Sequence, residues 1–487
     1  MLFGGFFCCI LTKNCTLCRI KQVLCLTKLS IYEKHYYQSH CSRPAVLDGG
    51  GCPCPVGCWR KIWAYMDYCR LILAIIALVF SGCRKEADYH PYIGETGDLA
   101  YNSYSSQFDY LWKCMSTGYV FWDVDETDWD AVYVEYMPKF QALDKKHEAG
   151  QDVTLAELET LYKGVIGGLK DHHFYFMIKN LFPSPNDTVS DFYIEPGQLE
   201  VERRDYYIEP RADEQMELDS FLSNIEQHYD IAEHETASVE IPVLEGPVIY
   251  HYCLIQLPDG RKIPYLWQSM AALTPILKAP ESDASNLLDH WLTTIAETPR
   301  EQLAGIILDN RANSGGYQDD MDYLLGSYID KKTEIFKTRY KEGPGRLEHS
   351  VWTPYYIFPQ SQYHRDLTAE NIPYVILCDI NSISMGEVEQ MFIREVLPTS
   401  YIIGERTFGA TGPLQPVAYI NLTYSGPFGN INTMHHDVYT STFEALIGGQ
   451  VREGIGCVPD QEVLRKNYNG DFKPQLDAAI EYIKNKH

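Results

Sequence analysis

Three short segments combine small polar residues with glycines in a pattern that could support chemistry. They are residues 308–316, 379–387 and 403–412, and each begins at the end of an apolar run typical of a buried strand. The second contains Ser382 and Ser384, just before an amphipathic helix. Free N–H groups at a helix N-terminus favour negative charge, so a serine there is suited to act as a nucleophile beside an oxyanion hole. The alternative is that either serine only caps the helix.

The first of these segments ends in two adjacent glycines, Gly315 and Gly316. Glycine has no side chain, so the backbone at such a pair can approach a ligand closely and direct N–H groups at it. The same residues also fit an ordinary turn between a strand and a helix. Taken alone, residues 308–316 therefore fit either a turn that binds a ligand or an ordinary structural turn.

The three segments, in this order, resemble the S41 serine peptidases, which include the carboxyl-terminal processing proteases and the tricorn core peptidase. That family shows Asp-x-Arg-x-Asn-x-Gly-Gly, then a turn with Asn and Ser that leads to Glu, then Gly-Glu-x-Thr-Phe-Gly. It closes with Glu-Gly-x-Gly-x-x-Pro-Asp, which is found here at residues 453–460. The resemblance covers roughly residues 260–487, together with the helix that ends near His173.

The resemblance implies roles for individual residues. The nucleophile position falls on Ser384, three residues before a glutamate, and Ser382 is the less favoured candidate. The oxyanion hole would use the N–H of Met385 together with an N–H from Gly315 or Gly316. No metal ion or cofactor is expected.

The general base is expected to be a histidine. Processing proteases of this family use a lysine in Thr-Phe-Gly-Lys-Gly, but that position is Ala410 here. Tricorn-like members use a histidine in Asp-x-His, which matches residues 171–173 and assigns the base to His173. The residue before it, His172, replaces a serine that relays to a glutamate in tricorn, and Glu453 occupies the matching glutamate position and could orient either imidazole. From the residues alone, the two histidines also fit a pair stabilised by a helix C-terminus.

Length and charge limit what kind of protein this can be. The chain has 487 residues with 45% hydrophobic residues, which is enough for a large core, and its formal charge is -25. Proteins that bind nucleic acid generally carry a basic surface, so no nucleic-acid partner is expected. The acidity is uneven, because residues 1–83 contain 9 basic and 3 acidic residues, and 11 of the 15 cysteines lie at or before Cys83.

Residues 66–83 are predicted to be a lipoprotein signal peptide. Arg70 precedes about ten apolar residues and the ending Phe-Ser-Gly-Cys, which resembles a bacterial lipobox that would be acylated at Cys83. The expected location is the bacterial cell envelope, with the protein anchored in a membrane and facing the periplasm or the surface. A short membrane anchor is the alternative. Residues 1–65 are interpreted as an over-extended N-terminus, with a zinc site at Cys15-x-x-Cys18 as the alternative.

The remaining chain is expected to form an α/β fold of the S41 type, which is ClpP/crotonase-like. Residues 84–180 should form an N-terminal helical subdomain that carries the histidines, with a capping box of Thr154 and Glu157 at the start of a helix. Residues 181–260 are predicted to be an inserted subdomain or lid, without a recognisable PDZ pattern. Residues 261–487 should form the α/β peptidase domain, because apolar strands alternate there with amphipathic helices.

The predicted function is that of a serine-type peptidase that hydrolyses a peptide or protein substrate in the cell envelope. The sequence gives no indication of oligomeric state. One alternative is a binding protein of the same fold that has lost turnover and holds a ligand or peptide. An esterase of the α/β-hydrolase type is disfavoured, because its Gly-x-Ser-x-Gly motif would need a glycine where Ser382 stands.

Overall fold

The computed structural model describes residues 103–182, 191–208, 214–241, 246–414 and 436–486. The predictions for residues 1–65 and 66–83, including the zinc alternative and the lipidation of Cys83, lie outside these ranges. Within the described ranges, no helix is both long enough and apolar enough to cross a bilayer.

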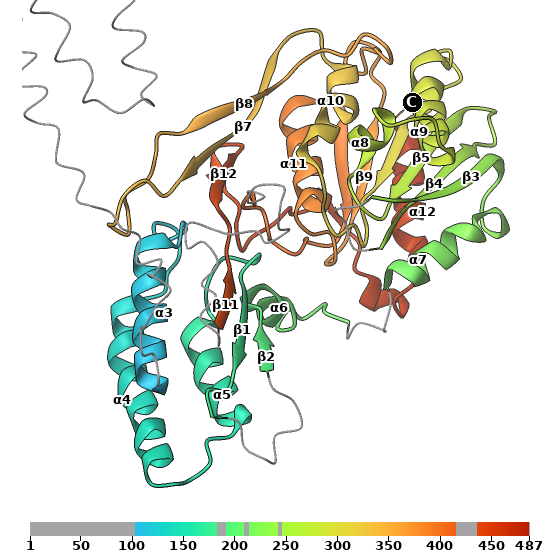
Figure 1. Ribbon diagram of the computed structural model, residues 1–487. Helices are drawn as coiled ribbons and strands as arrows, with labels where there is room; N and C mark the ends of the chain where they lie inside the picture. The colour runs from blue at the N-terminus through green and yellow to red at the C-terminus, as the bar shows by residue number, and fades with distance from the viewer. Residues whose placement is uncertain (1–102, 183–190, 209–213, 242–245, 415–435, 487) are drawn as a thin grey trace, which may run out of the picture. The chain divides into compact units, whose positions relative to one another are not determined.

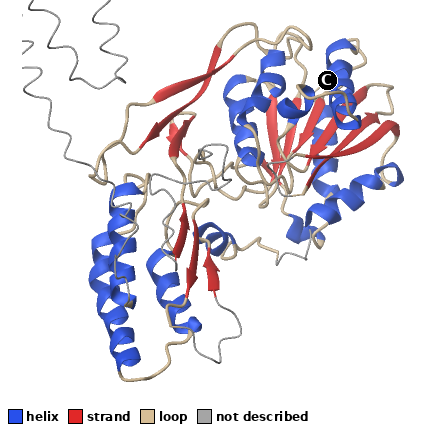
Figure 2. Cartoon of the chain, in the orientation of Figure 1, coloured by secondary structure: helices blue, strands red, loops and turns tan. Residues whose placement is uncertain are grey.

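The largest sheet within the described ranges, which we call the central sheet, has seven strands in the order β14-β10-β9-β6-β5-β4-β3 (Figures 1 and 2). The strands are β3 (Ile231–Glu240), β4 (Pro247–Gln256), β5 (Lys262–Gln268), β6 (Ile306–Asp309), β9 (Tyr374–Cys378), β10 (Ser400–Gly404) and β14 (Gln461–Glu462). Pairing is parallel from β5 to β14 and antiparallel among β3, β4 and β5. The carboxyl ends of β6, β9 and β10 therefore meet at one edge, which brings together the three segments singled out in the sequence.

Helices cover both faces of this sheet, which confirms the predicted α/β fold class. Side chains of α9 (Asp283–Glu297) and α11 (Met385–Val396) share a core with Leu308. The neighbouring Ile307 packs in a second core with α7 (Glu214–Ser223) and α12 (Lys473–Lys484). Successive residues of a strand point to opposite faces, so a strand covered on both sides is apolar throughout, and all four residues of β6 are buried. Two short helices, α8 (Leu273–Leu277) and α10 (Met321–Leu324), complete this part of the fold.

A helical region precedes the sheet and carries the histidines. It contains α3 (Tyr104–Gly118), α4 (Trp129–Glu148) and α5 (Leu155–Ile166). The predicted capping box is present at the start of α5, where Thr154 and Glu157 each satisfy a backbone N–H of the other. These helices share an aromatic-rich core with a small sheet of order β11-β1-β2, formed by β1 (Tyr175–Lys179), β2 (Asp191–Ile194) and β11 (His436–Tyr439). Residues 171–173 lie between α5 and β1 and are thereby tied to a strand more than 250 residues later in the chain.

Two features were not apparent from the sequence. Strands β3 and β4 belong to the central sheet, so that sheet begins inside the segment predicted as an insert, residues 181–260. The segment also holds the short helix α6 (Pro196–Val201). The second feature is a four-stranded sheet of order β13-β12-β7-β8, made of β7 (Thr333–Tyr340), β8 (Thr353–Ile357), β12 (Phe443–Ile447) and β13 (Gln450–Val451).

Candidate active site

Ser384 lies at the N-terminus of α11 in a strained backbone conformation. Its φ of 56° and ψ of -126° are uncommon for a residue with a side chain, and such strain costs on the order of 1–3 kcal/mol. Although Ser384 occupies the N-cap position, its side chain makes no capping hydrogen bond. The hydroxyl is therefore not used to stabilise the helix end, and this argues against the capping alternative for this serine.

Ser382 has the opposite character. It is fully buried, and its hydroxyl donates to the Asn310 carbonyl at 2.6 Å and accepts from the Asp379 N–H at 3.0 Å. The first contact joins the turn after β9 to the turn after β6, and the second lies within the turn after β9. Ser382 is thus a structural residue, as expected for the less favoured of the two serines.

The candidate oxyanion donors lie around Ser384. A Cβ atom added to Gly315 would lie 3.2 Å from Ser384 Oγ, so the glycine allows this close approach. The Gly315 N–H donates to Asn313 Oδ1 at 2.9 Å, whereas the N–H groups of Gly316 and Met385 make no hydrogen bond within the described ranges. Of the two glycines predicted for the second donor, Gly316 is therefore the one whose N–H is unoccupied.

The loop after β10, residues 404–412, is held from inside by two buried carboxylates. Glu387, one turn into α11, accepts from the N–H groups of Gly409 and Ala410 and from the Thr407 hydroxyl. Burial raises the pKa of Glu387 to about 7. Ala410 occupies the position of the family's lysine, and its N–H serves as one of these donors. The Glu387 side chain, three residues from Ser384, thus joins α11 to this loop by hydrogen bonds.

The second carboxylate is Glu453, which joins the loop to the histidine segment. Its Oε2 accepts from the N–H groups of Thr411 and Gly412, and its Oε1 accepts from the backbone N–H of His172 at 2.8 Å. Burial raises the pKa of Glu453 well above its usual range, and the nearby Asp171 carboxylate adds to the effect. Glu453, in the closing motif at residues 453–460, thus contacts the backbone of the segment 171–173 that carries the histidines. Glu453 and His172 are 281 residues apart in the chain.

The two histidines differ in how their rings are held. His172 Nδ1 lies 2.8 Å from the Phe408 carbonyl, and because a carbonyl can only accept, Nδ1 carries the proton. Both ring nitrogens of His173 are buried, and one of them lies within 4.8 Å of a carboxylate oxygen of Asp171 and one of Glu453. Burial lowers the pKa of each imidazole to about 4. Both rings are therefore neutral at pH 7, the state that a general base requires.

The structure contains no hydrogen bond between Ser384 and either imidazole within the described ranges. Catalytic hydrogen bonds are often long before substrate binds, so this arrangement does not exclude a base role. The segments that carry the two groups are nevertheless linked. Phe408, whose carbonyl binds His172, donates its N–H to the Ser382 carbonyl at 3.2 Å, two residues before Ser384.

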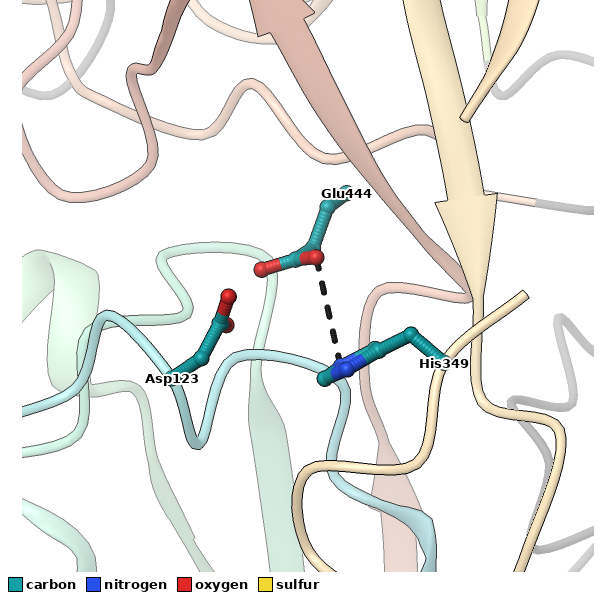
Figure 3. Close-up of side chains that lie close together, drawn as sticks. All are labelled: Asp123, His349 and Glu444. Carbon is teal, nitrogen blue, oxygen red and sulfur yellow. Dashed lines mark ion pairs between the residues drawn. The ribbon is translucent and has the colours of Figure 1, made fainter. Parts of the chain in front are cut away.

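Two groups of side chains within the described ranges have the composition of a metal site. The first is Asp171, His173 and Glu453, in which every carboxylate oxygen already accepts from an N–H or hydroxyl of the protein. The second is Asp123, His349 and Glu444, whose side chains point toward one another in Figure 3.

A guanidinium accounts for the second group. Arg339 donates to the carboxylates of both Asp123 and Glu444, while His349 Nε2 lies 2.8 Å from the Val120 carbonyl. The Arg339 guanidinium thus lies where a cation would bind in the second group, and we assign neither group a metal.

One residue near the site was not found by sequence reasoning. Arg204, just after α6, donates to three consecutive carbonyls of the loop after β10, at residues 406–408. In the sequence, Glu200 and Arg204 form an ordinary i,i+4 ion pair of the kind found on exposed helices, so no local signal identifies the contact.

A comparison with models of protein families gives a match to the central part of the chain. Residues 277–431 match the model of peptidase family S41. This match contains three of the four motifs and confirms the resemblance drawn from them. Membership of the S41 segment in a peptidase family supports a peptidase as the function of the protein. No curated protein matches the chain.

One solved structure shows a similar fold. A candidate peptidase from Parabacteroides merdae superimposes with a TM-score of 0.52 at 19% sequence identity, covering 78% of this chain and 96% of that one. Mature CPAF in complex with lactacystin gives a TM-score of 0.47 at 12% identity, covering 80% of this chain and 99% of that one. At these identities, the first comparison establishes the fold, and the roles of individual residues rest on the geometry described above.

Proposed function

We propose that the protein is a serine-type peptidase in which Ser384 is the nucleophile and His173 the general base. The observation that carries the proposal is the Ser384 backbone. A serine held with positive φ at a helix N-terminus, with its hydroxyl unused and a glycine turn against it, has the environment that an acyl-transfer nucleophile needs. The neutral imidazole beside Glu453 supplies a base on a segment linked to the same loop.

In the proposed reaction, Ser384 Oγ attacks the carbonyl carbon of the scissile peptide bond and its proton passes to His173. The N–H of Met385, with that of Gly316, stabilises the negative oxygen of the tetrahedral intermediate. The imidazolium then returns the proton to the leaving amine, which leaves an acyl ester on Ser384. Water attacks this ester with His173 again as base, and the serine is regenerated. Glu453, which accepts from the backbone N–H of His172, holds the histidine segment against the loop throughout the cycle.

A protein of this fold that binds peptides without cleaving them is the second candidate. The observation that favours it is the missing hydrogen bond between Ser384 and the imidazoles. Incubation of residues 84–487 with a defined peptide library, followed by mass spectrometry, separates the two. We expect new peptide termini to accumulate with time. Peptides retained by the protein with no new termini would instead favour the binding function.

We further propose that the protein is a lipoprotein of the bacterial cell envelope, anchored through Cys83. The proposal is supported by the apolar run and the Ser-Gly-Cys ending before a polar segment. Radiolabelled palmitate should be incorporated into the protein expressed in a bacterial host, and Cys83→Ser should abolish this incorporation and release the protein from the membrane fraction. Equal labelling of Cys83→Ser would contradict the anchor.

A further inference from the structure

Arg204 contacts the active-site loop from outside the S41 segment. It follows α6, in the region between the histidine segment and the central sheet, and its side chain is only 5% exposed. We propose that Arg204 is a positioning residue, which holds loop 404–412 in the geometry that the reaction requires. This inference rests on the proposed function and assigns a new residue to the same site.

The guanidinium of Arg204 binds a continuous stretch of backbone. Nη1 donates to the carbonyls of Thr407 at 2.7 Å and Arg406 at 3.3 Å, and Nη2 donates to the carbonyl of Phe408 at 2.9 Å. Three successive carbonyls of one loop therefore accept from a single side chain. Such contacts fix the backbone dihedral angles between the carbonyls, and only a planar group with several N–H donors in fixed directions can make all of them together.

A carboxylate fixes the guanidinium in turn. Glu200, one turn earlier, accepts from Arg204 Nε at 2.9 Å and from Nη2 at 2.5 Å. Its other oxygen accepts from Arg406 Nη2 at 2.9 Å, so the same glutamate also contacts the side chain of a loop residue. The two arginines and the glutamate form a charged network, in which the pKa of Glu200 is held below its usual range by both guanidinium groups despite its partial burial. Glu200 thus remains ionised and keeps Arg204 oriented toward the loop.

The carbonyls and the N–H groups of this loop have different partners. Arg204 binds the carbonyls of residues 406–408, whereas Glu387 and Glu453 bind the N–H groups of residues 409–412. Both ends of the loop are thereby fixed by buried side chains of Arg204, Glu387 and Glu453. The two carboxylates come from the serine helix and the closing motif, while Arg204 is the contribution of the α6 region.

One of the bound carbonyls is shared with the histidine segment. The Phe408 carbonyl accepts from both Arg204 Nη2 and His172 Nδ1, at 2.9 Å and 2.8 Å. Arg204 therefore helps to position the carbonyl that accepts from the His172 ring. The backbone N–H of His172 in turn donates a hydrogen bond to Glu453. Loss of Arg204 would free this carbonyl to move, and the movement would reach the histidines and Glu453, which binds the His172 backbone.

The test compares Arg204→Ala and Arg204→Lys with Arg203→Ala. Arg203 is the adjacent residue with the same charge; it is exposed, and within the described ranges its side chain makes no hydrogen bond or ion pair, so it controls for the loss of a positive charge. We expect Arg204→Ala to lower kcat on a peptide substrate roughly 10- to 100-fold with a change in KM below about threefold, because the chemical step depends on loop geometry. Arg204→Lys should recover only part of this loss, and Arg203→Ala should match the unmodified protein.

A second measurement separates positioning from general destabilisation. Amide hydrogen exchange followed by mass spectrometry should show faster exchange in residues 404–412 of Arg204→Ala, with exchange in strands β6 and β9 unchanged. Kinetics and loop exchange in Arg204→Ala equal to those of Arg203→Ala would overturn the inference. If the unmodified protein has no peptidase activity, the proposed function fails, and the exchange data alone then decide whether Arg204 fixes the loop.

Discussion

Replacing Ser384 with alanine is expected to lower the rate of peptide hydrolysis by about 10³-fold or more. The hydroxyl is the atom that forms the acyl ester, so its removal leaves only stabilisation by backbone N–H groups and substrate binding. The side chain makes no capping hydrogen bond, and the thermal midpoint should therefore change by no more than a few degrees. Initial rates and a thermal melt of the same preparation test both parts.

Ser314→Ala is the matched control for this change. Ser314 is an exposed serine on the neighbouring glycine turn. Its backbone N–H donates a hydrogen bond to the Ser269 carbonyl. We expect it to retain most of the activity. Ser382→Ala is informative in a different way, because its buried hydroxyl joins two turns, and it should lower the thermal midpoint more than Ser384→Ala does. A Ser384→Ala protein with unchanged turnover would remove this residue from the mechanism.

Replacing His173 with alanine should lower the rate by about 10³-fold, because no other group on its segment is assigned to accept the serine proton. His172→Ala should cost less, roughly tenfold. It removes the contact to the Phe408 carbonyl but keeps the backbone N–H that binds Glu453. Steady-state kinetics of the two variants side by side make the comparison. The reverse order, with His172→Ala the more damaging, would transfer the base role to His172.

The pH dependence of kcat/KM follows from the same environment. Burial lowers the pKa of His173 to about 4, and the neighbouring His172 contributes further. A base must be neutral, so activity should persist as pH falls through the usual histidine range and decline only near pH 4. Measurements between pH 4 and 8, with circular dichroism at each pH to verify folding, test this. A decline centred near pH 6.5 in folded protein would contradict a buried base.

Much of the site could be predicted because parallel strands impose a simple geometry. The apolar runs at β6 and β9 are fully buried, and that at β10 is buried over residues 402–404. Parallel pairing alone brings the turns that follow these strands to one edge of the sheet. The sequence was a weaker guide to which of Ser382 and Ser384 is the nucleophile and which is structural. It depends on a buried hydrogen bond from one hydroxyl to Asn310 and on the unusual dihedral angles of the other residue, and neither has a sequence pattern.

The region before the S41 segment was harder to predict for physical reasons. Strand β3 lies at an exposed edge of the sheet, so only one of its ten residues, Ala237, is buried, and it lacks the alternation of polar and apolar residues that identifies a strand. Arg204 contacts backbone carbonyls, and carbonyls of any residue type would serve equally well. The delivery of residues 171–173 depends on the pairing of β1 with β11, a contact between distant parts of the chain that local patterns do not encode.

The most direct test of the account is the site of covalent modification by a fluorophosphonate. An activated serine attacks the phosphorus atom, fluoride leaves, and a stable adduct remains on the oxygen. Tryptic digestion and tandem mass spectrometry then identify the modified residue. The account predicts a single adduct on Ser384, formed in the unmodified protein and much more slowly in His173→Ala. Folded protein that hydrolyses peptides but gains no adduct, or that carries it on another residue, would contradict the assignment of Ser384 as the nucleophile.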